Sequence, residues 1–327
     1  MAKYNVLVTG ATGAVGTPLV QALLKEGHTV IGVALDTQSP TVDEGFIYER
    51  CDVTDLMSVD RILEAHRPDT LIHLAALVHV RDSKLSFSDY SRVNYRSSEQ
   101  LFSAAQSKGV GRIVFASTVE VYGPTPDGAL IDETCPCQPD SDYARTKLLA
   151  EESLRAIGDG AALDYAILRF APVYSSTFRL NLDKRLYLHP HNVGYYVGRG
   201  SYALSLCSVE NIVLFVTRWL AKPRPGTFNL ADQQSYSVKE LLRLERRAGR
   251  ARIVLPIPYW PALTALSFIE AALNIAGRKT NTLSAANIRK LIRSPRWSTA
   301  RALDVVGQLP GKIETALTSN GQRETTG

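Results

Sequence analysis

Cysteine is scarce in this chain of 327 residues, and the few thiols form neither a disulfide framework nor a zinc-site pattern. We therefore predict reduced thiols and no bound metal; the four cysteines are Cys51, Cys135, Cys137 and Cys207. The N-terminal residues lack the long apolar run of a signal peptide, which predicts a cytoplasmic protein. No internal repeat or low-complexity run is evident, and hydrophobic residues at 45% with charged residues at 21% indicate an ordinary globular protein.

Long hydrophobic runs are also lacking. The most apolar helical window covers residues 259–277, which is at the short end of the roughly 17–25 residues needed to cross a bilayer. Pro261 lies near its start and Glu270 lies inside it. We therefore predict a buried or surface-seeking helix rather than a membrane span, with peripheral membrane contact as the most that this window supports.

Acidic residues are sparse in the second half of the chain. Residues 171–327 carry 22 Lys and Arg against 9 Asp and Glu, whereas residues 1–170 carry 15 against 23. A basic half of this kind favours an anionic substrate, a nucleic acid or a membrane surface as its partner. A solvated basic face explains the same counts, so charge alone leaves these alternatives open.

The first 170 residues alternate apolar, β-branched runs with helical segments, which is typical of βαβ units and a parallel sheet. The predicted strands are Asn5–Thr9, Thr29–Ala34, Phe46–Arg50, Thr70–Leu74, Arg112–Ser117 and Asp164–Arg169. The predicted helices are Thr17–Glu26, Asp55–His66, Tyr90–Ser107 and Tyr143–Ala156. The fold class is therefore α/β, with a doubly wound parallel sheet of the Rossmann type and a smaller, mostly helical C-terminal domain.

A glycine pattern, Gly10-Ala-Thr-Gly13-Ala14-Val15-Gly16, joins the first strand to the first helix. Glycines in this context permit a tight turn and a close approach of the backbone to a pyrophosphate, which the helix N-terminus then binds. The first interval is one residue longer than in the commonest dinucleotide fingerprint. A purely structural glycine turn is the alternative.

Asp36 ends the second strand pattern, 20 residues after Gly16. A carboxylate there accepts hydrogen bonds from the adenosine ribose and repels a 2′-phosphate. The position favours NAD over NADP, although a loop aspartate that begins a turn also fits. We accordingly predict a dinucleotide-binding domain over residues 1–174, with its sheet completed by residues 203–232, and a substrate-binding domain over residues 175–327 with a disordered tail from about residue 318.

Tyr143 and Lys147 are spaced to share one face of a helix. An ammonium group beside a phenol, whose unperturbed pKa is about 10, lowers that pKa, so the pair is typical of a general acid and base near neutral pH. The spacing is weak evidence by itself, because two solvated side chains produce it too. Upstream motifs strengthen the catalytic interpretation.

Taken together, these motifs resemble the extended short-chain dehydrogenase/reductase family, in its NAD-dependent epimerase/dehydratase branch of nucleotide-sugar enzymes. The resemblance covers roughly residues 3–232. Besides the glycine turn and the Tyr143/Lys147 pair, it rests on Cys51-Asp52-Val53, Ile72-His73-Leu74-Ala75-Ala76, Val93-Asn94, Ala116-Ser117-Thr118-Val119-Glu120-Val121-Tyr122-Gly123, Leu168-Arg169-Phe170 and Val209-Glu210-Asn211-Ile212.

The resemblance implies roles for individual residues. Cofactor binding is implied for Gly10, Gly13, Ala14, Val15, Gly16, Asp36, Asp52, Val53, Leu74, Ala75, Ala76, Asn94, Ser117, Tyr143, Lys147 and Phe170. Tyrosinate Tyr143 would take the proton of a secondary alcohol while a hydride passes to the nicotinamide, and Thr118 would polarise the reacting oxygen. Lys147 would hold the nicotinamide ribose. The implied assembly is a homodimer.

Departures from the family pattern limit the substrate assignment. Related 4,6-dehydratases have Thr-Asp-Glu where this chain has Thr118-Val119-Glu120, so dehydration is disfavoured, and Glu120 is either a substrate contact or a structural carboxylate. Pro172 replaces a frequent asparagine. Leu204 stands where many relatives have an arginine that grips the diphosphate. The candidates to replace that arginine are Arg179, Arg185 and Arg199.

Three functions stay open at this point. The first is an NAD-dependent epimerase or 4-keto reductase/dehydrogenase of a nucleotide sugar. The second is a dehydrogenase or reductase of a sterol-like or other hydrophobic alcohol, which the apolar 259–277 window and Leu204 favour. The third is a non-catalytic NAD-sensing or nucleic-acid-binding protein, supported only by the basic Arg243–Arg252 stretch; the Thr118, Tyr143 and Lys147 set argues against it, so no nucleic-acid partner is expected.

Overall fold

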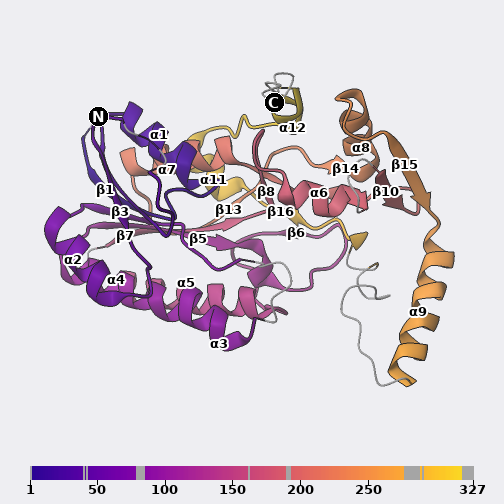
Figure 1. The fold of residues 1–327 in the computed structure, drawn as a ribbon, viewed down its shortest axis with the longest axis horizontal. Coiled ribbons are helices and arrows are strands. Elements are labelled where there is room, and N and C mark those ends of the chain that lie inside the picture. Colours follow the sequence, from indigo (N-terminus) through magenta and orange to yellow (C-terminus); the bar gives the residue numbers. More distant parts are fainter. Residues whose placement is uncertain are drawn as a thin grey trace.

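The computed structural model describes residues 2–39, 41, 43–78, 85–160, 163–188, 193–275, 288 and 291–318. Its centre is a seven-stranded parallel sheet in the order β13-β7-β5-β4-β1-β2-β3 (Figure 1). The strands of this sheet are β1 (Asn5–Thr9), β2 (Thr29–Ala34), β3 (Phe46–Arg50), β4 (Thr70–His73), β5 (Arg112–Thr118), β7 (Asp164–Phe170) and β13 (Gly226–Leu230). All six strands predicted before residue 170 are present, and the predicted α/β fold class is confirmed.

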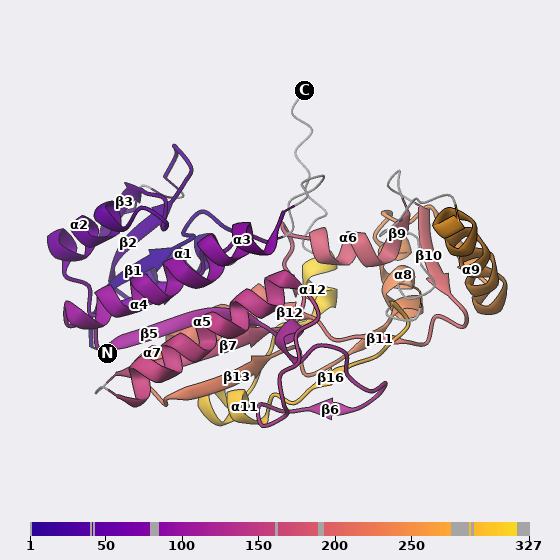
Figure 2. The same cartoon turned by 90° about the horizontal axis from the view of Figure 1, so that it is seen from below.

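Helices cover both faces of the sheet, as Figure 2 shows from below. One face is covered by α1 (Gly16–Lys25), α7 (Val209–Ala221) and α11 (Ala300–Val306), and the other by α2 (Leu56–His66), α4 (Ser97–Ser107) and α5 (Asp142–Asp159). Alternation along β1 explains the two layers, because Val6 and Val8 pack into the first core whereas Leu7 packs into the second.

The helix predicted over residues 90–107 has two changes of geometry. A short helix α3 (Phe87–Tyr90) continues as a π-helical turn (Ser91–Arg96) and then as α4. Such wider turns within a helix frequently occur at functional sites. Here the π turn contains Asn94, whose side-chain amide bonds both backbone groups of Leu77, at 2.7 and 2.8 Å.

Of residues 203–232, which were predicted to complete the main sheet, β13 does so, but the segment Ala203–Ser208 does not. Its two short strands, β11 (Ala203–Leu204) and β12 (Cys207–Ser208), pair with β14 (Tyr236–Ser237) and β8 (Val173–Tyr174) instead. In the outermost strand β13, the backbone N–H of Asn229 donates to the carboxylate of Glu133 and not to a further strand. Only β13, as predicted, extends the sheet beyond β7.

The C-terminal part is mostly helical but also contains a small sheet. Strands β9 (Tyr187–Leu188), β10 (Val193–Val197) and β15 (Ile253–Ile257) form it in the order β15-β10-β9. The accompanying helices are α6 (Leu180–Leu186), α8 (Val238–Arg247), α9 (Tyr259–Ile275) and α12 (Ile313–Thr318). The remaining elements are the 3-10 turn Val119–Tyr122 and the parallel pair β6 (Leu130–Ile131) and β16 (Arg296–Trp297). The predicted disordered tail beyond residue 318 lies outside the described residues.

Candidate active site

A cavity of about 1160 Å³ opens at the carboxyl ends of the central strands. It lies where the strand order reverses, since β1 leads to β2 on one side while β4 lies on its other side. Ligands of open α/β sheets bind at such a switch point. The cavity volume is above the roughly 300–1,000 Å³ of a typical small-molecule pocket, so it suits a dinucleotide together with a substrate.

The glycine turn is shaped for close contact between backbone segments. Gly10 has φ of +71°, and a Cβ there would lie 2.9 Å from the backbone nitrogen of Ala75. A Cβ on Gly16 would overlap the carbonyl oxygen of Gly10. Because α1 begins at Gly16, the positive end of its dipole lies beside the cavity that Gly13, Ala14 and Gly16 line. The turn therefore fits a dinucleotide pyrophosphate.

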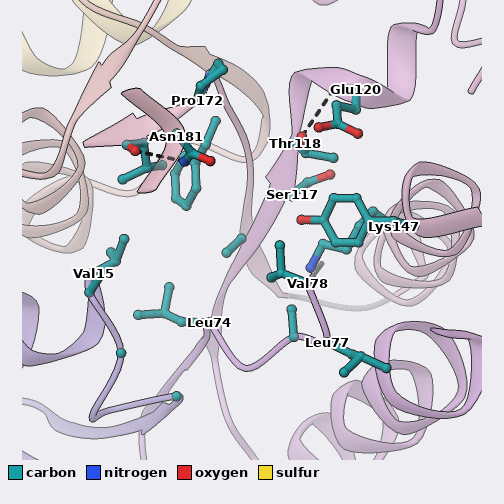
Figure 3. Close-up of a pocket in the computed structure, with 18 of the residues that line it drawn as sticks. Val15, Leu74, Leu77, Val78, Ser117, Thr118, Glu120, Lys147, Pro172 and Asn181 are labelled. Carbon is teal, nitrogen blue, oxygen red and sulfur yellow. Dashed lines mark hydrogen bonds between the residues drawn. The ribbon is translucent and has the colours of Figure 1, made fainter. Parts of the chain in front are cut away.

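The predicted cofactor residues line the cavity from two sides. Asp36 follows β2, and its Oδ2 accepts a hydrogen bond of 2.5 Å from the hydroxyl of Thr12. The other predicted cofactor residues that line the cavity are Gly10, Gly13, Ala14, Val15, Gly16, Asp52, Val53, Leu74, Ala75, Ala76, Ser117, Tyr143, Lys147 and Phe170. In Figure 3, Val15 and Leu74 lie across the cavity from Thr118 and Lys147.

Asn94 is the exception among these predicted residues. It is buried and does not line the cavity in the described structure. Its amide instead holds the backbone of Leu77, which does line the cavity beside Val78 (Figure 3). Asn94 therefore supports the wall of the cavity, because a buried amide satisfies its donors and acceptor on neighbouring backbone.

Thr118, Tyr143 and Lys147 come together at one side of the cavity. Ser141 caps α5 by accepting a hydrogen bond from Ala144, which sets the start of the helix and places Tyr143 and Lys147 one turn apart on its inner face. Thr118 ends β5, and its Oγ1 accepts the N–H of Glu120 at 3.2 Å, as Figure 3 shows. The threonine's own hydroxyl proton is thus left to donate toward the cavity.

The pKa shifts of the pair differ from the prediction. Burial raises the pKa of Tyr143, with Glu120 adding to the increase, so the expected lowering by Lys147 is not observed. Burial also lowers the pKa of Lys147 to about 7, and Glu151 only partly opposes this effect. Burial thus disfavours the charged form of each group, the tyrosinate and the ammonium alike.

A buried ionic network lies beneath this side of the cavity. Glu151, one turn after Lys147 on α5, accepts hydrogen bonds from Ser117 Oγ at 2.5 Å and from Arg169 at 2.7 Å. Arg169 lies on β7, so the network joins α5, β5 and β7 behind Thr118 and Lys147. Glu151 was missed at the sequence level because no motif distinguishes it from an ordinary helical glutamate.

The three arginines considered for diphosphate binding differ in whether they reach the cavity. Arg185 on α6 lines the cavity, where burial lowers its pKa while Glu120, also in the lining, opposes that effect. Arg179 is instead bound to buried Glu245 at 2.7 Å, and Arg199 is exposed and outside the cavity lining. Arg185 is thus the one of the three that reaches the site.

Two further cations, Lys184 and Arg293, line the same end of the cavity and were not predicted. Arg293 reaches it because the following segment is held across the cavity mouth: Ser294 Oγ accepts from Ala203 N at 2.9 Å, and Ser205 Oγ donates to Pro295 O at 2.8 Å. Leu204 also lines the cavity, at the position where the family resemblance implies an arginine. No local motif indicates a contact between residues about ninety positions apart in the sequence.

Residues 6–231 match the family model described as NAD dependent epimerase/dehydratase family. The chain belongs to this family. Membership confirms the predicted enzyme class and NAD as the cofactor, and the residues of the cavity fit that group. Among the described residues, no group of His, Cys, Asp and Glu side chains is arranged to hold a metal ion.

Relatives of several specificities resemble the chain. UDP-glucose 4-epimerase of Vibrio cholerae is 27% identical over 78% of this chain and 79% of its own length. Sterol demethylase protein B of Methylococcus capsulatus is 28% identical over 95% of both chains. N-acetyl-alpha-D-glucosaminyl-diphospho-ditrans,octacis-undecaprenol 4-epimerase of Escherichia coli O157:H7 is 26% identical over 91% of this chain and 88% of its own.

Solved structures support the fold along the chain. UDP-glucose 4-epimerase of Thermotoga maritima, solved with UDP-glucose, superposes with a TM-score of 0.75 at 21% identity and covers 96% of each chain. At this identity the likeness shows the fold, which includes the C-terminal part.

Proposed function

We propose that this protein is an NAD-dependent epimerase or 4-keto reductase/dehydrogenase of a nucleotide sugar. The observation that carries the proposal is the position of Thr118, Tyr143 and Lys147 in the wall of the cavity that the glycine turn and Asp36 also line. A protein that only sensed NAD would have no need of this proton-transfer set. Fold likeness by itself would not decide the point.

Each of these residues has a defined task in the proposed reaction. When bound, NAD accepts the hydrogen and the electron pair that leave the carbinol carbon. Tyr143 exchanges the proton of the carbinol oxygen, and Thr118 donates a hydrogen bond that fixes this oxygen. Since the pKa of Lys147 is lowered to about 7, its amine takes up or returns the proton that the pair exchanges near neutrality.

Dehydration is not part of the proposal. Elimination needs an acid beside the catalytic threonine, and that position is Val119, a buried side chain that lines the cavity. Glu120 alone remains as a carboxylate on this turn, where it faces the charge of Arg185. An acidic pair for elimination is therefore incomplete.

The cationic end of the cavity favours a diphosphate substrate. Arg185, Lys184 and Arg293 line this end, and guanidinium and ammonium groups bind phosphate oxygens through charge-assisted hydrogen bonds. We assign the diphosphate of the nucleotide sugar to this cluster, in place of the arginine that Leu204 replaces. The names of the V. cholerae and T. maritima relatives support this substrate class.

A second candidate is a sterol-like or lipid-linked alcohol. Leu204 and Trp297 line the cavity beside the cationic cluster, and they offer apolar surface to such a substrate. Sterol demethylase protein B, which matches over 95% of both chains, supports this alternative. Both candidates use the same proton-transfer residues and differ only in the group that fills the far end.

The decisive experiment is a substrate screen of the purified protein with NAD. A panel of nucleotide sugars and a panel of sterol-like alcohols are compared by NADH absorbance and by the stereochemistry of the recovered product. A net rise in NADH absorbance identifies oxidation. Inversion at the carbinol carbon without a net change in NADH absorbance identifies epimerisation. Turnover of sterol-like alcohols but of no nucleotide sugar would replace the first candidate by the second.

A further inference from the structure

Helix α9 combines an apolar sequence with an exposed position. Its seventeen residues contain one charged side chain, Glu270. Trp260 is 71% exposed and Phe268 is 77% exposed, and of its described side chains only Leu263 is buried. Figures 1 and 2 show α9 at the edge of the molecule, away from the seven-stranded sheet.

An apolar helix without a polar face normally lies in a protein core or in a membrane. The described residues of this chain leave Trp260, Phe268 and Ile269 of α9 exposed to solvent. Edge strand β15 leads into the helix and exposes Ile253 and Leu255 as well. An apolar surface of this size indicates a partner rather than scattered surface residues.

The positive charge in the segment before α9 favours a negatively charged partner. From Ser237 to Ile257 the chain has six basic residues and two acidic ones, Glu240 and Glu245, and α9 adds one acidic residue. Both acidic side chains are engaged, because Glu240 caps α8 through Ser237 and buried Glu245 binds Arg179. The exposed basic side chains that remain before β15 are Lys239, Arg243, Arg246, Arg247 and Arg252.

We propose that α9 and the basic segment before it form a docking surface for an anionic lipid bilayer. Trp260 and Phe268 enter the interface between headgroups and acyl chains, where aromatic side chains are favoured. The arginines meet the negative headgroups, each contributing about a fivefold increase in affinity. None of the helices in the described ranges is long and apolar enough to cross a membrane, so the contact is peripheral.

A second copy of the chain is a poorer occupant of the same surface. A symmetric contact through α9 would bring two equally basic segments toward each other, because both partners of a two-fold interface present the same residues. An anionic bilayer satisfies the apolar helix and the positive charge together. The surface is also continuous with the substrate end of the cavity, since α6, which carries Arg185, packs against β9 and β10 beside β15.

The test is flotation of the full-length protein with vesicles of phosphatidylcholine, with and without phosphatidylglycerol. We expect binding to the anionic vesicles that weakens at high salt, and a loss of about tenfold or more in affinity for Trp260→Ser/Phe268→Ser. The control for the single variant Phe268→Ser is Met57→Ser, because Met57 on α2 is also exposed, at 75%. The Met57→Ser protein should bind the vesicles as the parent does. All variants should keep the activity on a water-soluble substrate.

Three results would overturn the proposal. One is no binding of the parent protein to anionic vesicles. Another is equal loss in Met57→Ser and Phe268→Ser. The third is conversion of a dimer to a monomer in Trp260→Ser/Phe268→Ser, measured by light scattering, without any change in vesicle binding, which would assign the surface to self-association.

Discussion

The cofactor end of the cavity is lined by backbone and short side chains that follow β1, β2 and β4, whereas the substrate end is lined by long side chains from α6 and residues 293–297. At the first end a single Cβ on Gly16 has no space. At the second end Arg185, Lys184 and Arg293 come from segments more than a hundred residues apart. The difference teaches that the scaffold fixes the cofactor geometry tightly, while the substrate end depends on separate side chains that can change one at a time.

The largest expected effect arises where the two ends meet. Tyr143→Phe should reduce turnover by about a thousandfold, because general acid–base transfer contributes about 10²–10⁴. NAD affinity, measured by titration calorimetry, should change little. Tyr95→Phe, which removes a hydroxyl that bonds Glu99 one turn later in the same continuous helix, is the control. Unchanged turnover in Tyr143→Phe would remove this tyrosine from the mechanism.

Acid should act on the scaffold of the cofactor end. Burial lowers the pKa of His73 to about 3, and the neutral ring joins Thr9 to Ser98 at 2.7 and 2.8 Å. Below about pH 6.5 this histidine is protonated in the unfolded chain but stays neutral in the folded chain. The free energy of unfolding therefore falls by about 1.4 kcal/mol per pH unit as the pH drops from 6.5 toward 3.

This slope can be isolated by comparing denaturant unfolding of the parent protein and of His73→Gln across that pH range. Other buried groups, among them Asp232, whose pKa burial raises to about 6, contribute equally to both proteins and cancel in the difference. Identical slopes in the two proteins would contradict the prediction.

Steric crowding at the glycine turn gives the next effect. Gly16→Ala should destabilise the protein by about 1–3 kcal/mol and weaken NAD binding, since the new Cβ overlaps Gly10 O and must move the turn. Gly111→Ala is the matched control, because no atom lies within 4 Å of its Cβ position. Thermal unfolding with and without NAD measures both effects.

Removing a cation from the substrate end should weaken substrate binding but not NAD binding. Arg185→Met should raise the KM for the sugar substrate by about ten- to a hundredfold, because a hydrogen bond to a charged group contributes about 1.5–3 kcal/mol. The affinity for NAD should stay near that of the parent. Arg199→Met removes an equally long cation outside the cavity and should have no such effect. Equal KM values for both variants would place the diphosphate elsewhere.

The smallest effect concerns cofactor choice. Asp36→Ala should reduce the preference for NAD over NADP by about tenfold, since a carboxylate that binds the ribose also repels a 2′-phosphate. Asp43→Ala, at an exposed position beyond β2, is the control. Unchanged selectivity would make Asp36 a turn residue that only bonds Thr12.

Local sequence predicted the cofactor end well. The glycine turn, Asp36, Asp52 and the 74–76 segment all line the cavity, because each lies at a strand end and the carboxyl ends of parallel strands meet at one edge of the sheet. Asn94 lies behind the cavity wall instead. Its direction depends on a π-helical turn that helical periodicity does not reveal.

The substrate end was predicted only in part. Arg185 was one of three candidates, and nothing in the sequence separates it from Arg179, which Glu245 holds in an ion pair. Lys184 and Arg293 were not foreseen, since their positions depend on contacts between segments distant in sequence. The two-residue strands in Ala203–Ser208 likewise find partners that no local pattern indicates.

The sequence by itself determined the parallel sheet, the glycine turn and the helical spacing of Tyr143 and Lys147, because strand alternation, glycine conformations and helix periodicity are local properties. Only the tertiary structure decided which cations reach the cavity and in which direction the pKa values of Tyr143 and Lys147 are shifted. Burial lowers the pKa of Lys147 and raises that of Tyr143, and burial is set by packing from distant parts of the chain.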